Sequence, residues 1–464
     1  MAIYIYNSLT KKKEEFVPLN SGQVNMYTCG VTVYDECHIG HARSLYIFEV
    51  IRNYLELKGY KVKFVRNITD IDDKIINRAR QLNMDWQKLV EKYIQDYQEL
   101  LKLLNIRKAD IEPRATEHIS QMIKNIQTLI KKNYAYVTSS GVYFNVKKFN
   151  TYGKLSSQKI DEMLEGVRVE VPEEKKDPLD FALWKFSSQD EPGWESPWGK
   201  GRPGWHIECS TMAIEYLGET LDIHGGGRDL IFPHHENEIA QSEAITDKPF
   251  ARYWIHHGLL TINGQKMSKS LGNFVNVRDI LKNYHLDVLK LFFLSSHYSH
   301  PIDFSWEKLK DFNKARMRFI NLCQRLNSVG IIEDKSSSCF INDPKINSLK
   351  EEFFEAMDDD FNTAKAIAVL FKIVSIIDSY FTHYKENIQK IIYGKSTIED
   401  LLKIFGISLE IEPIEEEILN KIRLRNKLRE NKEYFKADQI REELKELGII
   451  LEDTAEGTIY RKEI

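Results

Sequence analysis

The spacing of apolar residues near the start of the chain predicts a βαβ unit. Residues 24–28 form a short apolar run that is typical of a strand, and residues 62–65 form another. Between them, apolar side chains recur every three or four residues from Leu45 to Leu55, which predicts an amphipathic helix ending near Gly59. The start of this helix should therefore lie at the carboxyl edge of a parallel sheet, where open α/β sheets bind ligands.

The following stretch predicts a second α/β half, separated from the first by an insertion. Helical patterns cover residues 75–105 and 115–132, and the mixed pattern over 112–175 suggests an insertion between two halves of a nucleotide-binding domain. A further helix is expected to end at Gly218, and residues 221–224 then form a strand.

The last third of the chain has a mainly helical pattern. Residues 305–404 are nearly all helical in periodicity, 413–447 predict a helical hairpin, and 449–461 are strand-like. Residues 421–436 are locally basic, which is typical of a solvated face but also makes this segment the best candidate for phosphate contacts. The basic residues there are Lys421, Arg423, Arg425, Lys427, Arg429, Lys432 and Lys436, against the acids Glu430 and Glu433.

Composition allows several domains and gives no sign of a membrane span. The chain has 464 residues and a formal net charge of −4, enough material for about three domains. No apolar run reaches the roughly 18 residues of a membrane span, so the simplest expectation is a cytoplasmic protein without a membrane partner. Its five cysteines are scattered and odd in number, which argues against a disulfide framework.

Two histidines lie three residues apart at the start of the first predicted helix. His38 and His41 could donate hydrogen bonds to a phosphate chain, and Gly40 would let that chain approach the backbone. Taken alone, such a pair is more often two surface histidines. A second segment, Lys266-Met-Ser-Lys-Ser270, could close over a triphosphate, although lysine-rich loops are usually only solvated. In this order, the two segments resemble the signatures of class I aminoacyl-tRNA synthetases.

Polar loops follow two of the predicted strands and should lie at the same edge of the sheet. The three aspartates in residues 67–74 are most simply explained as helix caps. Three glycines at 225–227 free the backbone for close approach of a ligand, or form a plain tight turn. Asp229, just beyond them, could accept a hydrogen bond from a ribose hydroxyl.

Four metal-ligand residue types are distant in sequence but converge in the expected fold. Cys29 ends a strand, and Cys209 belongs to the second half of the domain, which lines the same crevice. His234 and Glu238 share one face of a helix that should begin at Pro233. Spacing alone would leave each residue with a structural role, whereas two thiolates, an imidazole and a carboxylate together make a zinc-like set.

Motifs along the whole chain, tail included, resemble those of cysteinyl-tRNA synthetases, and we find no departure at the signature positions. The motifs are Thr28-Cys-Gly-Val-Thr-Val-Tyr-Asp35, His38-Ile-Gly-His41, Arg66-Asn-Ile-Thr-Asp-Ile-Asp-Asp-Lys74, Gly204-Trp-His-Ile-Glu-Cys-Ser210, His224-Gly-Gly-Gly227, Phe232-Pro-His-His-Glu-Asn-Glu238, Lys266-Met-Ser-Lys-Ser270, Asp358-Asp-Asp-Phe-Asn-Thr363 and Leu451-Glu-Asp-Thr-x-x-Gly-Thr458.

The resemblance implies a set of sites and cofactors: one Zn²⁺ per chain, and Mg²⁺ with ATP. The implied catalytic residues are His38, His41, Lys266 and Lys269; the ATP site adds Gly40, Gly225, Gly226 and Asp229; the cysteine pocket holds Cys29, Thr69, Trp205 and His224; and the metal ligands are Cys29, Cys209, His234 and Glu238.

The resemblance also implies an α/β fold with a Rossmann-type parallel-sheet catalytic domain, an inserted connective subdomain, an α-helical anticodon-binding region and a small C-terminal α/β tail. The expected segments are 1–111, the first half of the catalytic domain; 112–175, the connective insertion; 176–304, the second half, with the zinc site and the lysine signature; 305–411, the helical stem-contact and anticodon-binding domain; and 412–464, a C-terminal tRNA-binding subdomain.

The implied activity is ATP-dependent ligation of L-cysteine to tRNA(Cys) through a cysteinyl-adenylate, by a monomer. Zinc would select cysteine, because an apolar pocket separates such a near-isostere as serine only about 10²-fold. One alternative is a cysteine ligase acting on a small amine acceptor, which would not need the helical tail. Another is a zinc-stabilised RNA-binding protein without catalysis, which would leave the histidine and lysine signatures without a role.

Overall fold

The structure, a computed structural model, describes residues 2–157, 174–267, 272–328, 342–409, 415–454 and 457–462. The chain divides into two compact units, and each of them is built from several segments. The first unit comprises Met1–Asn283, Ser296–Phe304 and Asp358–Phe361, and the second comprises Tyr284–Ser295, Ser305–Met357 and Asn362–Ile464.

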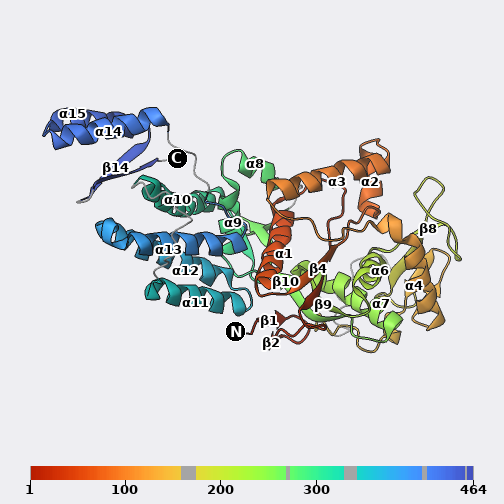
Figure 1. The fold of residues 1–464 in the computed structure, drawn as a ribbon. Helices are drawn as coiled ribbons and strands as arrows, with labels where there is room; N and C mark the ends of the chain where they lie inside the picture. The colour runs from red at the N-terminus through yellow and green to blue at the C-terminus, as the bar shows by residue number, and fades with distance from the viewer. Residues whose placement is uncertain are drawn as a thin grey trace. The chain divides into compact units, whose positions relative to one another are not determined.

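Four parallel strands form the central sheet of the first unit, in the order β10-β9-β3-β4. Strands β4, β9 and β10 are labelled in Figure 1. Helix α1 (Ile39–Leu57) joins β3 to β4, so the predicted βαβ unit is confirmed. Strand β3 pairs with β9 from the second half, and this places Thr28 beside Gly225 at the carboxyl edge. Ligand sites of open α/β sheets lie at such a switch point. The strands are β3 (Gln23–Thr28), β4 (Lys61–Arg66), β9 (Leu221–Gly227) and β10 (Ala251–His257).

An antiparallel sheet, in the order β5-β6-β7-β8, lies between the two halves in sequence. It follows the helical residues expected at 115–132, which form η1 (Ala115–His118) and α4 (Ile119–Lys131). The sheet starts inside the expected insertion, and its last two strands lie beyond residue 175, so the boundaries of that insertion remain a prediction. The strands are β5 (Ala135–Val137), β6 (Gly141–Phe144), β7 (Phe181–Phe186) and β8 (Gly201–Pro203), and η2 (Val146–Lys148) follows β6.

The acidic loop after β4 has the capping role that the sequence suggested. Residues 75–105, expected to be helical, form α2 (Asp73–Gln81) and α3 (Trp86–Leu103). Asp72 caps α2 by accepting from the Lys74 amide at 2.8 Å. Asp70 accepts from the amide and the hydroxyl of Thr116, at 3.0 and 2.6 Å. These two carboxylates therefore have structural partners.

The glycine run after residue 224 neither turns nor leaves the sheet. Strand β9 continues through Gly227 and pairs with β10 along this run, so the tight-turn interpretation is wrong. A Cβ on Gly225 would lie 2.2 Å from the Phe48 ring, and one on Gly226 would lie 2.8 Å from the His235 ring. Both glycines thus let neighbouring elements pack closely against the strand.

Two helices of the second half approach the same edge. Helix α6 (Trp205–Leu217) ends at Gly218, as predicted, where the backbone has a φ of 93°. Helix α7 (Glu236–Thr246) follows η3 (Arg228–Leu230) and η4 (Ile231–His235). The chain enters this helical stretch at Pro233, as predicted, because Phe232 has extended backbone angles (φ −136°, ψ 132°), as residues before proline usually do. The regular α-helix begins three residues later, at Glu236.

Short elements complete the first unit. The residues Asp358–Phe361 return to it from the helical region: Asp358 accepts from the Tyr54 hydroxyl at 2.7 Å, and Asp360 accepts from the Tyr298 hydroxyl at 2.7 Å and the Tyr6 amide at 2.9 Å. The remaining elements are β1 (Tyr4–Asn7), β2 (Lys12–Glu15), β11 (Leu260–Ile262), β12 (Gln265–Lys266), β13 (Ile302–Phe304) and α8 (Val277–Leu281).

The second unit is mainly helical, as predicted for residues 305–404. Its C-terminal module, residues 415–462, contains the predicted helical hairpin and ends in a β-hairpin; Ile422, Leu444, Ile449 and Leu451 form a small core there. The helices are α9 (Leu286–Leu294), α10 (Trp306–Ser328), α11 (Pro344–Asp358), α12 (Thr363–Tyr380), η5 (Phe381–His383), α13 (Tyr384–Ile404), α14 (Glu416–Glu430) and α15 (Tyr434–Glu446), and the strands are β14 (Ile449–Thr454) and β15 (Gly457–Lys462).

Candidate metal centre and nucleotide site

The four predicted metal ligands lie together at the carboxyl edge of the sheet. Cys29 follows β3, Cys209 lies on α6, His234 lies in η4, and Glu238 lies on α7. Their ligand atoms are all within 4.8 Å of one another. Ligands about 2.0–2.3 Å from a tetrahedral ion would be roughly 3.3–3.8 Å apart, so small movements would bring all four into range.

Polar atoms in this group are buried and incompletely partnered, which fits a metal. Glu238 is 0% exposed, and its Oε1 lies 2.8 Å from His234 Nε2 and accepts from the Cys29 thiol at 3.2 Å. Nevertheless, His234 Nε2 makes no aligned hydrogen bond, and the Cys209 thiol reaches Asn67 Oδ1 only at 3.6 Å. The donor set of two sulfurs, one nitrogen and one oxygen matches the ligands that zinc prefers.

The pKa values in the group favour a negative pair. Burial raises the pKa of the Cys29 thiol, and Cys209 and Glu238 raise it further. For Cys209, burial opposes ionisation, but contacts with Cys29 and His234 lower the pKa to about 6. Burial is likewise outweighed at Glu238, where His224 and His234 hold the carboxyl pKa well below its usual range. A thiolate and a carboxylate together would attract a dication.

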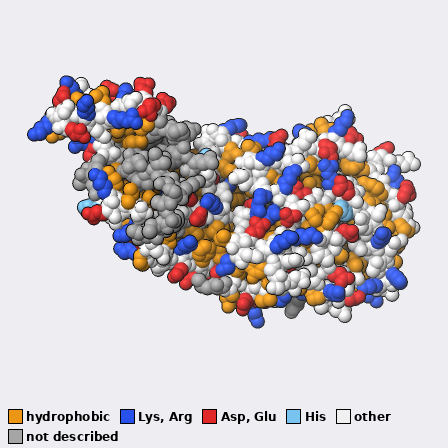
Figure 2. Space-filling model, in the orientation of Figure 1, with side chains coloured by type: hydrophobic (Ala, Val, Ile, Leu, Met, Phe, Trp, Pro, Cys, Tyr) orange, Lys and Arg blue, Asp and Glu red, His pale blue; other side chains and the backbone are white. Residues whose placement is uncertain are grey.

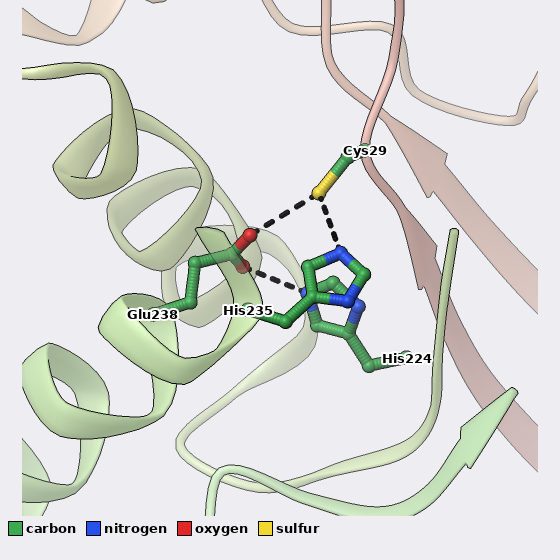
Figure 3. A group of neighbouring side chains, drawn as sticks. All are labelled: Cys29, His224, His235 and Glu238. Atoms are coloured by element: carbon green, nitrogen blue, oxygen red, sulfur yellow. Dashed lines mark hydrogen bonds and ion pairs between the residues drawn. The ribbon is translucent and has the colours of Figure 1, made fainter. Parts of the chain in front are cut away.

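A second set of side chains shares two members of this group (Figure 3). The Cys29 sulfur lies 3.3 Å from His235 Nε2, and His224 Nε2 lies 2.8 Å from Glu238 Oε2. Since Cys29 and Glu238 belong to both sets, one ion can use only one set at a time. The set with Cys209 has two thiols and is the more zinc-like.

His224 was expected in the cysteine pocket, and the structure places it behind Glu238. It is 0% exposed, stacks on Trp254 with ring centroids 4.4 Å apart, and bonds to Glu238. This contact orients the carboxylate, as outer partners of metal ligands commonly do. A direct contact of His224 with cysteine remains a prediction.

Sequence reasoning missed two histidines of this centre. His206 Nδ1 lies 2.7 Å from His234 Nδ1 and so fixes the orientation of that ring. His235 links Cys29 to His256, whose Nε2 is 2.8 Å from His235 Nδ1. A signal was present, because six of the 13 histidines fall between residues 206 and 257.

Two expected pocket residues border the metal group. Trp205 begins α6, and its ring stacks on His234 with centroids 3.9 Å apart. Thr69 is 2% exposed and accepts from Asn67 Nδ2 at 3.0 Å, while Asn67 Oδ1 accepts from the Gly30 amide at 2.9 Å. Their contact with cysteine is untested by these observations and stays a prediction.

Another residue of this region, Glu208, went unnoticed in the sequence. It is buried on α6 next to Cys209. Burial, with Cys209, Asp72 and Asp70 nearby, raises the pKa of its carboxyl well above the usual range. A lone glutamate inside a helical motif gives no sequence signal for such an environment.

The histidine pair at the start of α1 has a fixed hydrogen-bonding pattern. His38 caps the helix: its Nδ1 accepts from the Gly40 and His41 amides at 3.1 and 3.3 Å. His41 Nδ1 in turn accepts from the His38 amide at 3.2 Å, and the two rings stack 3.8 Å apart. With Nδ1 accepting, each neutral ring carries its proton on Nε2. Both rings therefore offer a donor at the start of the helix.

Met267 of the lysine signature and Phe274, which follows the signature, lie beside this pair. Met267 Cε would be 3.7 Å from a Cβ on Gly40, and the Phe274 ring packs edge-on against His38 at 5.5 Å. Lys266 ends β12, but its side chain and all of Lys269 lie outside the described residues. Burial, with His38 and Lys74 nearby, lowers the pKa of His41 to about 3, so its ring is neutral.

Three further residues were predicted to contact ATP, and their surroundings do not test that role. Asp229 is exposed in η3, where a ribose hydroxyl could reach it. Gly225 and Gly226 have packing reasons for lacking a side chain. The roles of these three residues toward ATP stay predictions.

The basic segment of the tail is largely neutralised by ion pairs. On the face shown in Figure 2, Lys and Arg side chains alternate with Asp and Glu over the C-terminal module at upper left. Five of the seven basic residues have acidic partners, and Lys427 and Lys432 are exposed. The pairs are Lys421–Glu443, Arg423–Glu416, Arg425–Asp453, Arg429–Asp453 and Lys436–Glu433.

Family comparison matches most of the chain. The tRNA synthetases class I (C) catalytic domain matches residues 15–314, and the DALR domain matches residues 352–410. The chain is similar to a cysteine–tRNA ligase of Thermodesulfovibrio yellowstonii, with 53% identity over 99% of both chains. It is also similar to that of Aquifex aeolicus, with 48% identity over 100% of this chain and 99% of the relative.

Solved structures share the fold at low sequence identity. Methionyl-tRNA synthetase of Mycobacterium tuberculosis, in complex with methionyl-adenylate, aligns with a TM-score of 0.62 and 15% identity, covering 82% of this chain and 89% of that one. A putative arginyl-tRNA synthetase from Campylobacter jejuni gives 0.58 and 13%, covering 84% and 94%. These likenesses support the predicted α/β architecture.

Proposed function

Because this chain belongs to the cysteine–tRNA ligases, or cysteinyl-tRNA synthetases, we propose that it joins L-cysteine to tRNA(Cys) in two steps. The cysteine carboxylate first attacks the α-phosphorus of ATP, and pyrophosphate leaves. A 3′-terminal ribose hydroxyl of the tRNA then attacks the carbonyl carbon of the cysteinyl-adenylate, and AMP leaves. The observation that carries the proposal is the gathering of four metal-binding side chains at the sheet edge.

Catalysis would come from positioning and charge neutralisation, with no nucleophilic side chain. His38 and His41 would donate from Nε2 to the phosphates, a role supported by the Nδ1 atoms being occupied by backbone amides. Lys266 and Lys269 would stabilise the charge that develops on the phosphates. Mg²⁺ would accompany ATP, as is usual where phosphoryl charge must be neutralised.

Cysteine selection would depend on one zinc ion per chain. Cys29, Cys209, His234 and Glu238 would hold it, and the buried donor set described above supports this. When bound, zinc prefers a soft thiolate to a neutral hydroxyl and lowers the pKa of a thiol bound to it. Trp205 would form one wall of the pocket, since its ring covers His234.

Among the helices that the structure describes, none is long and apolar enough to cross a membrane.

The second unit would bind the tRNA, and the active form would be a monomer. The exposed lysines of the C-terminal module, Lys427 and Lys432, are the basic side chains there most open to phosphate.

The decisive experiment is aminoacylation of unfractionated tRNA with each of the twenty amino acids. We expect charging with cysteine alone, and cysteine-dependent ATP–pyrophosphate exchange without tRNA. Exchange without charging would favour a ligase acting on a small amine, and absence of both would favour a binding protein. Deleting residues 412–464 should leave exchange nearly intact while sharply reducing charging and flattening the salt dependence of tRNA binding.

A further inference from the structure

Glu208 is a buried carboxylate without a matching donor. It is 1% exposed, and within the described ranges of the chain neither Oε1 nor Oε2 has a hydrogen-bond partner. Buried carboxylates are normally paired or hydrogen-bonded, because leaving them unmatched is costly. The orphaned oxygens of Glu208 therefore call for a partner.

Glu236 on α7 shows the ordinary arrangement. It is 0% exposed, and its oxygens accept from the amides of Gly153, Leu155 and Ser156 at 2.9, 3.1 and 2.8 Å. The protein therefore satisfies a buried glutamate with backbone amides where the role is structural. Glu208 lacks such amides.

The position of Glu208 is at the border of the cysteine pocket. On α6 it follows Trp205 by three residues and precedes Cys209 by one, so the three side chains cover one side of the helix. Trp205 stacks on His234, and Cys209 belongs to the metal group. Thr69 is near enough to favour the ionised form of Glu208. Its hydroxyl accepts from Asn67 and has one proton left to donate, so it can serve at most one of the two carboxylate oxygens.

The other carboxylates near Glu208 already have partners. Asp72 is used as the cap of α2, and Asp70 accepts from the amide and hydroxyl of Thr116. Glu208 is thus the carboxylate of this group whose oxygens make no well-formed hydrogen bond within the described chain.

We propose that Glu208 binds the α-ammonium group of the substrate cysteine. The proposal rests on the proposed function, in which the substrate sulfur meets the ion held in part by Cys209. In cysteine only Cβ and Cα lie between the sulfur and the amino nitrogen, so one substrate molecule can reach both the ion and the neighbouring residue of α6. The ammonium group supplies the donors that both oxygens of Glu208 lack.

This subsite would make the enzyme select an amino acid and not merely a thiol. A site built to hydrogen-bond a substrate group rejects an analogue that lacks the group, because the buried partner is then left unpaired. 3-Mercaptopropionate keeps the thiol and the carboxylate of cysteine but has no ammonium group. It is therefore the probe that isolates Glu208.

The test compares L-cysteine and 3-mercaptopropionate by calorimetric titration of the zinc-loaded, full-length protein. The parent should prefer cysteine by about 10³-fold or more, since donors lost against a buried partner typically cost about 10⁴ in discrimination. Glu208→Gln should lower this preference at least about 100-fold, through loss of cysteine affinity, and raise KM for cysteine while leaving KM for ATP unchanged. Glu208→Asp, which keeps the charge, should recover part of the preference.

The matched control is Glu215→Gln, which removes the same charge from the exposed face of the same helix. It should keep the parent preference. An unchanged preference in a zinc-loaded Glu208→Gln variant would overturn the subsite. If that variant fails to fold, the parent protein alone still tests the proposal, because equal affinity of the parent for the two compounds would also overturn the subsite. A parent without cysteine-dependent pyrophosphate exchange would instead defeat the proposed function.

Discussion

Two ionic centres in this molecule, one buried and one half-buried, differ in how completely their polar atoms are paired. In the first unit, Glu238 lies among thiols and imidazoles whose donor atoms are short of partners. In the C-terminal module, the 1% exposed Arg425 gives both NH₂ groups to the Asp453 carboxylate, at 2.5 and 2.6 Å, and bonds Thr458 at 3.1 Å.

The difference separates a structural centre from one built for a ligand. The bidentate pair of the module is a strong, geometrically defined contact, and both carboxylate oxygens of Asp453 are matched by guanidinium N–H groups. The centre around Glu238 concentrates negative groups and open donors, which are costly unless a ligand completes them. The module should therefore be stable by itself, whereas the first centre should respond to metal and substrate.

The largest effect is expected from breaking the structural centre. Arg425→Met removes two charge-assisted hydrogen bonds to the partly exposed Asp453 carboxylate, at about 1.5–3 kcal/mol each, and so about 3–5 kcal/mol in all. Local opening of residues 415–462, measured by amide hydrogen exchange, should become easier by this amount, and tRNA charging should fall. Cysteine activation should stay near the parent value, and a drop in zinc content would contradict the separation of the two centres.

Next in size is the loss of one ligand from the metal centre. Cys209→Ser should weaken zinc binding by roughly 2.5–4 kcal/mol, about a quarter of the 10–16 kcal/mol typical of four-ligand zinc sites. Zinc per chain, measured by atomic emission after dialysis against a chelator, should drop toward zero. Cys323→Ser, at a buried cysteine of α10, is the control and should keep its zinc. Hydrogen exchange of the C-terminal module should not change in either variant.

A lysine that belongs to neither centre should affect chemistry alone. Lys269→Ala should slow cysteine-dependent pyrophosphate exchange, because the activation free energy should rise by about 2.7–4 kcal/mol. This is the typical value for a charge-stabilising contact made in the transition state. Zinc content and module stability should equal those of the parent. Lys248→Ala, which removes an exposed lysine paired with Glu219, is the matched control, and an equal rate in both variants would refute the role.

The smallest effect is a dependence of the module on acid. Arg425 holds the pKa of Asp453 well below its usual range, and Thr458 and Arg429 lower it further, against an opposing effect of burial. A lowered folded pKa means that this stability is complete above the ordinary value of about 3.9 and is lost as pH falls through the folded value. Hydrogen exchange of residues 415–462 should therefore be constant from neutral pH down to about 5 and rise below it. Asp453→Asn should remove the acid dependence.

The parts of the fold that local pattern determines could be predicted from the sequence. The βαβ unit and the helical hairpin follow from apolar spacing, and the candidate ligands Cys29 and Glu238 follow from residue type at the sheet edge. The helix entry at Pro233 also follows from the sequence, because proline favours an extended residue before it and fits the first turn of a helix.

The rest depends on contacts between distant segments, which a single sequence does not encode locally. Gly225 was expected to admit a ligand, yet it admits the Phe48 ring, 177 positions earlier in the chain. The ring of His206 orients His234, and Glu208 has no partner, only because α6 and α7 approach the same edge. Such environments become visible only when the elements are assembled.

The four residues Asp358–Phe361 bear on how such an enzyme can be cut or recombined. They belong to the first unit although helices of the second unit precede and follow them. A fragment that stops at residue 304 would leave the buried hydroxyls of Tyr54 and Tyr298 without their acceptors, each at a cost of about 1–3 kcal/mol. The catalytic part therefore cannot be transferred as residues 1–304 alone. Gene fusion or domain exchange at residue 304 would have to supply a substitute for these four residues.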